Sequence, residues 1–246
     1  MTAVALRPLV LPAEHGGWGF LLEPVVLALL VAPSAPGLLI GLGALGIFLL
    51  RHPLKLAAHD WLRRRRYPRT PACELLLLGY GAAALAAFAG AALLGGLGAL
   101  APLLAAVPFG LTQFAFDARN HSRALSAELS GAIAPAAVAA SIALAGGRAA
   151  SLAAALALLV AARSVPAVLY VRSLLRGNHK ALMLAAHAGA VIVAVVTGPW
   201  TAILAMCLLL IRAALPASGL PARRIGIREI GWGAVFVALV SAGFWI

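Results

Sequence analysis

Long apolar runs separated by short polar segments extend along the whole chain. Several of these runs reach the roughly 20 residues that a helix needs to cross a lipid bilayer. The runs are continuous and do not alternate between apolar and polar positions, as the strands of a membrane-spanning barrel would. The pattern therefore predicts an all-α transmembrane protein.

Glycine and proline interrupt the apolar runs and mark the boundaries of about nine predicted helices. We expect residues 1–246 to form a single integral membrane domain. The predicted spans cover residues 18–32, 37–62, 71–94, 99–116, 122–145, 149–176, 180–196, 200–215 and 227–246. Pro53 lies inside the second span and predicts a kink there. The seventh and eighth spans are short, so they form either two crossings or one re-entrant hairpin.

Composition agrees with a lipid environment. Hydrophobic residues make up 63% of the chain and charged residues 11%, whereas a soluble domain has about 25% charged residues. Alanine, leucine and glycine predominate, and small residues allow membrane helices to pack closely. We therefore expect a tightly packed bundle surrounded by lipid.

The charges are distributed unevenly between alternate connections of the predicted helices. The basic connections contain Arg63, Arg64, Arg65, Arg66 and Arg69; Arg119 and Arg123; Arg172, Arg176 and Lys180; and Arg212, Arg223, Arg224 and Arg228. The other connections contain only Arg148. Because cytoplasmic loops are enriched in lysine and arginine, this alternation predicts nine spans with the N-terminus inside and the C-terminus outside. It also explains the net charge of +12 without a nucleic-acid partner.

Ionisable residues inside the apolar runs are the most informative, because a charge in lipid needs a partner or a cavity. Glu23 lies one to two turns inside the first span, just after Glu14 and His15. We expect Arg51 or Lys55 to be its partner, and the sequence does not choose between them. Glu23 belongs either to a salt bridge that fixes helix packing or to a ligand, proton or metal site.

Three further groups of polar residues share helix faces or turns. Arg51, Lys55 and His59 follow i, i+4, i+8 spacing, which places them on one face. His121 and Glu128 are seven residues apart and are expected to share a face, while Asp117 or Asn120 is expected to cap that helix. Arg163 and Tyr170 share a face of the sixth span, and Arg163 requires a carboxylate or an anionic ligand.

Together these residues predict a polar cavity that opens to the cytoplasm. The candidate ligand-binding residues are Glu14, His15, Glu23, Arg51, Lys55, His59, Asp60, Asn120, His121, Glu128, Arg163 and Tyr170. Their positive balance predicts an anionic ligand such as a phosphate, a diphosphate or a carboxylate. The lipid-facing side would accommodate an apolar tail. We assign no metal ligands, because no metal-binding spacing of histidines or cysteines occurs.

Several of these segments resemble one bacterial family. Glu14-His15-Gly16-Gly17-Trp18 with Glu23-Pro24, His52-Pro53-Leu54-Lys55 and Asp117-Ala118-Arg119 are similar to the YwiC-like family of multi-pass membrane proteins. The resemblance covers essentially the whole chain. It implies a location in the bacterial cytoplasmic membrane, and it implies no particular reaction.

A weaker resemblance links the chain to UbiA-type membrane prenyltransferases. The span count, the loop placement and the stretch Arg123 to Ile133 carry it. It implies a cytoplasmic cavity that binds an isoprenyl diphosphate through Mg²⁺ held by two Asp-rich motifs. This chain has only Asp60 where the first motif belongs, and Arg172 to Lys180 contains no acid. Mg²⁺ remains a candidate cofactor, although its carboxylate motifs are largely absent.

The sequence leaves three functions open. The first is a divergent UbiA-type protein that binds or processes a lipid-linked anion. The second is a transporter or ion-coupled carrier, which buried charges and proline-broken helices permit. The third is a non-enzymatic assembly factor of a membrane complex. The expected partners are the lipid bilayer and a lipid-like or anionic small molecule.

Overall fold

The protein is a bundle of helices, seen here in a computed structural model that describes residues 7–10, 15–177, 179–215, 219 and 221–246. The described residues contain no β-strand. The elements are α1 (Arg7–Val10), α2 (His15–Val31), α3 (Ala35–Leu62), α4 (Thr70–Gly95), the 3₁₀-helix η1 (Leu97–Leu100), α5 (Ala101–Ala118), α6 (Leu125–Ile133), α7 (Ala136–Ala145), α8 (Ala150–Arg176), α9 (Lys180–Thr197), α10 (Trp200–Ala214) and α11 (Ala222–Gly243).

The predicted all-α transmembrane fold is confirmed. Among the described residues, seven helical segments are long and apolar enough to cross a membrane, and Gly17–Val31 and Trp200–Ala214 are shorter apolar helices. With α6 and α7 taken as one segment, these account for the nine predicted helices. The predicted spans at 180–196 and 200–215 correspond to two separate helices, α9 and α10, joined at Gly198 and Pro199.

Two predicted boundaries need correction. The predicted helix at 122–145 begins at Leu125 and is broken between α6 and α7, because Pro135 occupies the position before α7. The last helix begins at Ala222, directly after Pro221, and not near 227. Arg223, Arg224 and Arg228 were expected in a loop, yet they lie on the first turns of α11, since arginine is a good helix former.

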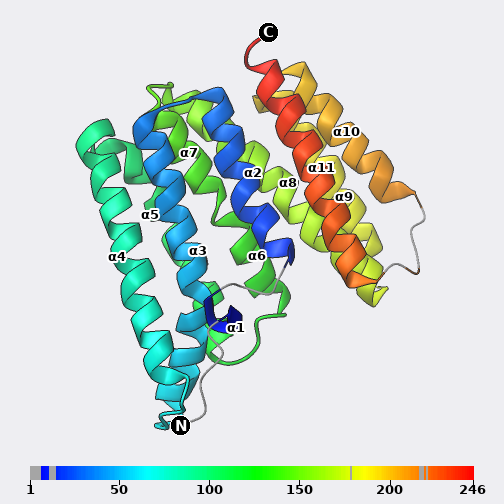
Figure 1. Cartoon of the computed structure of the whole chain (residues 1–246). Coiled ribbons are helices and arrows are strands. Elements are labelled where there is room, and N and C mark those ends of the chain that lie inside the picture. The colour runs from blue at the N-terminus through cyan, green and yellow to red at the C-terminus, as the bar shows by residue number, and fades with distance from the viewer. Residues whose placement is uncertain (1–6, 11–14, 178, 216–218, 220) are drawn as a thin grey trace.

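The basic connections lie at one end of the bundle. In Figure 1 the connections from α3 to α4, from α5 to α6 and from α8 to α9 lie toward the end marked N. The connections from α2 to α3 and from α7 to α8, together with the C-terminus, lie at the opposite end. The fold thus separates the arginine-rich loops from the nearly uncharged ones.

The core of the bundle lies around α7, whose residues from Ala136 to Ala143 are all buried. By contrast α4 and α5 are peripheral and expose large apolar side chains, among them Leu85, Leu93 and Leu104. Such an apolar outer surface suits contact with lipid chains. Small residues bring helices close together, as predicted: a Cβ at Gly46 of α3 would lie 2.9 Å from the Cβ of Ala84 on α4.

Candidate functional site

Four charged side chains from four helices form a buried network, here called the Arg163 network. It consists of Glu23 on α2, Arg163 on α8, Arg212 on α10 and Glu229 on α11. The Nε of Arg163 lies 3.6 Å from a carboxylate oxygen of Glu23, and its Nη2 lies 3.5 Å from Glu229. Arg163 is only 3% exposed, so its charge depends on these two acids.

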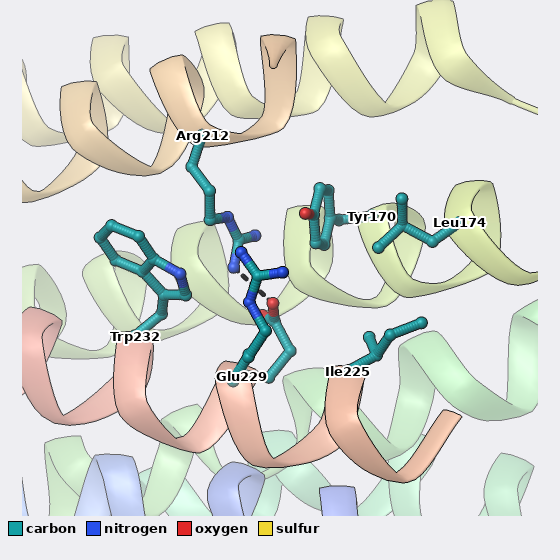
Figure 2. A pocket seen from close by; sticks show the side chains of 7 residues that line it. Tyr170, Leu174, Arg212, Ile225, Glu229 and Trp232 are labelled. Carbon is teal, nitrogen blue, oxygen red and sulfur yellow. Dashed lines mark hydrogen bonds and ion pairs between the residues drawn. The ribbon is translucent and has the colours of Figure 1, made fainter. Parts of the chain in front are cut away.

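Arg212 completes this network and is surrounded by aromatic rings. Its Nη1 donates a hydrogen bond to Glu229. Its guanidinium lies 3.9 Å from the ring centroid of Tyr170 and 5.5 Å from that of Trp232. Figure 2 shows Tyr170 and Trp232 on either side of Arg212, with Glu229 facing it from α11. Stacking against aromatic faces stabilises the desolvated cation.

The expected partner of Glu23 was wrong. We predicted Arg51 or Lys55 of α3, whereas the structure places Arg163 of α8 beside Glu23. The physical reason is helix packing: α2 turns this acid toward α8 and α11, and α3 turns its basic face toward α5. Arg163 was predicted to require a carboxylate or an anionic ligand, and two carboxylates lie within 4 Å of it.

A second polar group lies between α3 and α5. The Nε of Arg51 donates a hydrogen bond to Asp117 at 2.8 Å, and its Nη2 donates a second one at 3.3 Å. The side-chain amide oxygen of Gln113, once the amide is oriented toward Arg51, accepts at 3.0 Å. This bidentate pair joins two helices and holds the buried carboxylate of Asp117 in place.

Next to that ion pair is a cavity of about 200 Å³, here called the Lys55 pocket. Its lining consists of Lys55, Leu56, His59, Asp117 and Asn120. The ammonium of Lys55 donates a hydrogen bond of 2.6 Å to the hydroxyl of Ser122. Since a water molecule needs only about 10–15 Å³ of such space, the pocket has room for a small polar group.

Asp60 and Glu128 have partners of their own. The carboxylate of Asp60 is fully buried and accepts hydrogen bonds from Arg69 at 2.7 Å and from Thr70 at 2.8 Å. The hydrogen bond to Asp60 raises the pKa of the Arg69 guanidinium. Glu128 accepts a hydrogen bond of 2.6 Å from Arg172. Both acids tie helix ends to neighbouring segments.

The region between α5 and α6 differs from the prediction. Neither Asp117 nor Asn120 caps α6, whose capping position is Ala124 with no side-chain hydrogen bond. His121 was expected to share a helix face with Glu128, but it lies exposed in the turn before α6. Asn120 has a positive φ of 59°, a conformation that asparagine adopts more readily than most residues. Helix α6 begins at Leu125, later than the predicted 122, because this turn reverses the chain first.

Two predicted site residues cannot be placed. Glu14 lies outside the described residues, and so does the side chain of His15, the first residue of α2. Of the other ten, Glu23, Arg163 and Tyr170 belong to the Arg163 network and its surroundings, and Lys55, His59 and Asn120 line the Lys55 pocket. No ion pair between described residues joins these two groups. Asp60, Glu128 and His121 lie outside both groups, so the residues expected around one cavity are dispersed over several places.

Sequence reasoning missed three members of the site. Arg212 was assigned to the basic connection between the last two predicted helices, and neither Glu229 nor Trp232 was proposed as a site residue. All three line a small cavity with Tyr170. A signal was present: Ile225, Glu229 and Trp232 follow i, i+4, i+7 spacing, which places them on one face once the helix begins at Ala222.

The donor set does not fit a divalent metal. Among the described residues, no group of three or more histidine, cysteine, aspartate or glutamate side chains is placed to hold one. Asp60, the acid at the position of an Asp-rich motif, already accepts hydrogen bonds at both carboxylate oxygens. Since Mg²⁺ requires free oxygen ligands, we derive no chemistry through that ion.

The bundle and its buried charges define a multi-pass α-helical membrane protein. A family model described as YwiC-like protein matches residues 11–143. The match covers more than half of the chain, so the protein belongs to the YwiC-like family. The matched segment contains every residue that lines the Lys55 pocket. No curated protein and no solved structure matches the chain.

Proposed function

We propose that the protein binds a lipid-linked anion, such as an isoprenoid phosphate, in the Lys55 pocket. The ligand's charged headgroup occupies the pocket, and its apolar tail lies in the bilayer. The protein would sit in the bacterial cytoplasmic membrane with the pocket opening to the cytoplasm, at the basic end of the bundle.

The observation that carries this proposal is the pairing of an open cavity with positive charge. Lys55 and His59 face a cavity of about 200 Å³, while the carboxylate of Asp117 is neutralised by Arg51. Lys55 uses one of its three N–H donors on Ser122. The others can donate to phosphate oxygens, and hydrogen bonds between charged groups are among the strongest in proteins.

The surroundings of the pocket support a ligand with a tail. The pocket lies at the end of α5, and Asp117 is the one buried residue of that helix. Above it, Leu104, Val107 and Leu111 of α5 are between 50% and 73% exposed. A headgroup bound at Lys55 would therefore continue directly into a lipid-facing surface.

The proposal covers binding and leaves a reaction open. The side chains present do not support a metal-dependent transfer of the UbiA type. Asp60, the acid at the position of the first Asp-rich motif, already accepts hydrogen bonds from Arg69 and Thr70. Arg and Lys side chains hold a phosphate without a metal.

Binding of a prenyl phosphate tests the proposal directly. Purified protein in detergent would be titrated with farnesyl phosphate, and complex formation would be followed by native mass spectrometry. Lys55→Gln should weaken binding roughly 10- to 100-fold, the effect of losing one hydrogen bond to a charged group. Farnesol, which lacks the phosphate, should bind no better to the wild type than to this variant.

Lys180→Gln is the matched control, because Lys180 is an exposed lysine at the same end of the bundle and does not line the pocket. It should leave affinity unchanged. Equal affinity of the wild type and Lys55→Gln, or equal loss in both variants, would contradict the proposal. Competition by inorganic phosphate would distinguish recognition of the headgroup alone from recognition of the whole lipid.

A further inference from the structure

A small cavity beside the Arg163 network has a chemistry of its own. It measures about 10 Å³ and is lined by Tyr170, Leu174, Arg212, Ile225, Arg228, Glu229 and Trp232. This is about the volume that one water-sized particle needs. None of these residues lines the Lys55 pocket, so the cavity is a separate place in the fold.

The cavity contains hydrogen-bond donors that lack acceptors. Arg212 is only 7% exposed, yet its Nε and Nη2 have no hydrogen-bond partner among the described residues. Tyr170 and Trp232 line the same cavity and carry a hydroxyl and an indole N–H, which are further hydrogen-bond donors. An unsatisfied buried N–H destabilises the folded protein, and more so when it is charged, so the two nitrogens of Arg212 require an acceptor.

The neighbouring acid makes no hydrogen bond with these two nitrogens of Arg212. Glu229 uses one carboxylate oxygen on Arg212 and the other on Arg163. Around the cavity and its network, three arginines face two glutamates: Arg163, Arg212 and Arg228 against Glu23 and Glu229. Arg163 and Arg212 are balanced by Glu23 and Glu229, so the one excess positive charge is that of Arg228, whose side chain is exposed.

We infer that this cavity binds one small monovalent anion of about the size of chloride. Arg212 supplies the charge, and Tyr170 and Trp232 supply neutral donors from the two sides shown in Figure 2. A water molecule is the competing occupant, and the dependence of stability on chloride concentration distinguishes the two.

Thermal unfolding in detergent tests the anion site. The melting temperature would be measured in sodium chloride and in sodium gluconate at equal ionic strength. A ligand that binds only the folded state raises the melting temperature as its concentration rises. We expect a higher melting temperature in chloride, with a saturable dependence on chloride concentration.

Two kinds of variant keep the test decisive. Tyr170→Phe removes one donor and retains the ring, so it should fold and weaken the apparent chloride affinity roughly tenfold. Arg212→Gln should abolish the chloride effect on the melting temperature. If the Arg212→Gln variant does not fold, the chloride affinity of Tyr170→Phe remains the test. Arg148→Gln, on the opposite side of the fold beside Trp245, should retain the full effect.

Two results would overturn the inference. One is an identical melting temperature in chloride and gluconate. The other is a chloride effect of the same size in the wild type, Tyr170→Phe and Arg148→Gln, which would indicate a general salt effect. Neither result bears on farnesyl phosphate binding at Lys55, so this inference and the proposed function fail separately.

Discussion

Single charged residues contribute very differently to this protein according to their depth. The pair of Arg66 and Glu74 is exposed, with 70% of the arginine side chain accessible. Glu229, by contrast, serves two arginines that are each less than 10% exposed. An exposed pair is weak because solvent screens it, whereas removing one partner of a buried pair leaves an uncompensated charge.

We predict that Glu229→Gln destabilises the protein by about 3–5 kcal/mol, since it leaves Arg163 and Arg212 short of charge. Glu23→Gln should cost less, because Arg163 keeps Glu229 as a second partner. Glu74→Gln is the surface control and should cost about 0–1 kcal/mol. Thermal unfolding in detergent would rank the three variants; an equal cost for Glu229→Gln and Glu74→Gln would contradict the network.

At the scale of the helices, the close approach of α2 and α11 brings Glu23 into the network. Gly233 of α11 is buried against Glu23, and a Cβ there would lie 2.9 Å from the Cγ of that side chain and closer still to its carboxylate. Two residues earlier, a Cβ at Gly231 would meet no atom within 4 Å. Close packing against Glu23 therefore requires a glycine at position 233 of α11, whereas position 231 has room for a larger side chain.

Gly233→Ala should therefore destabilise the bundle by about 1–3 kcal/mol, the usual cost of overpacking, and should displace Glu23 from Arg163. Gly231→Ala should be neutral or should stabilise by about 0.5–1 kcal/mol, because alanine favours the helix. Melting temperatures of the two variants measure this difference. A loss of stability in Gly231→Ala as large as in Gly233→Ala would refute the packing argument.

The sequence predicted which segments of this chain are helical better than it predicted where each helix begins and ends. Apolar runs located all nine helices because a spanning helix must be apolar over its length. The start of α11 was missed because Arg223 and Arg224 look like a loop, although arginine is compatible with a helix end at the membrane surface. Pro135 was predicted to lie inside one helix, whereas in the structure it separates α6 from α7.

At the scale of the whole molecule, charge asymmetry predicts orientation. The basic connections lie together at one end of the bundle in Figure 1, as the alternation in the sequence requires. Because lysine and arginine are retained on the cytoplasmic side, this end should face the cytoplasm, and the connection between α7 and α8 should face outward.

Cysteine labelling in intact cells tests the orientation. In a background with Cys73 and Cys207 replaced by alanine, Ala149→Cys should react with a membrane-impermeant thiol reagent, and Arg65→Cys should react only after the membrane is opened. Both positions are exposed at the ends of helices or in a loop. Labelling of Arg65→Cys in intact cells would reverse the predicted topology.

The sequence by itself determined the class of protein, the number of helices and the separation of charge between alternate loops. These features follow from the cost of placing polar groups in lipid, which acts on each segment separately. Only the tertiary structure decided which charges meet. Glu23 pairs with Arg163 and not with Arg51, and Arg51 pairs with Asp117. Ion pairs between helices depend on how the helices rotate and pack, and no periodicity within a single helix records that.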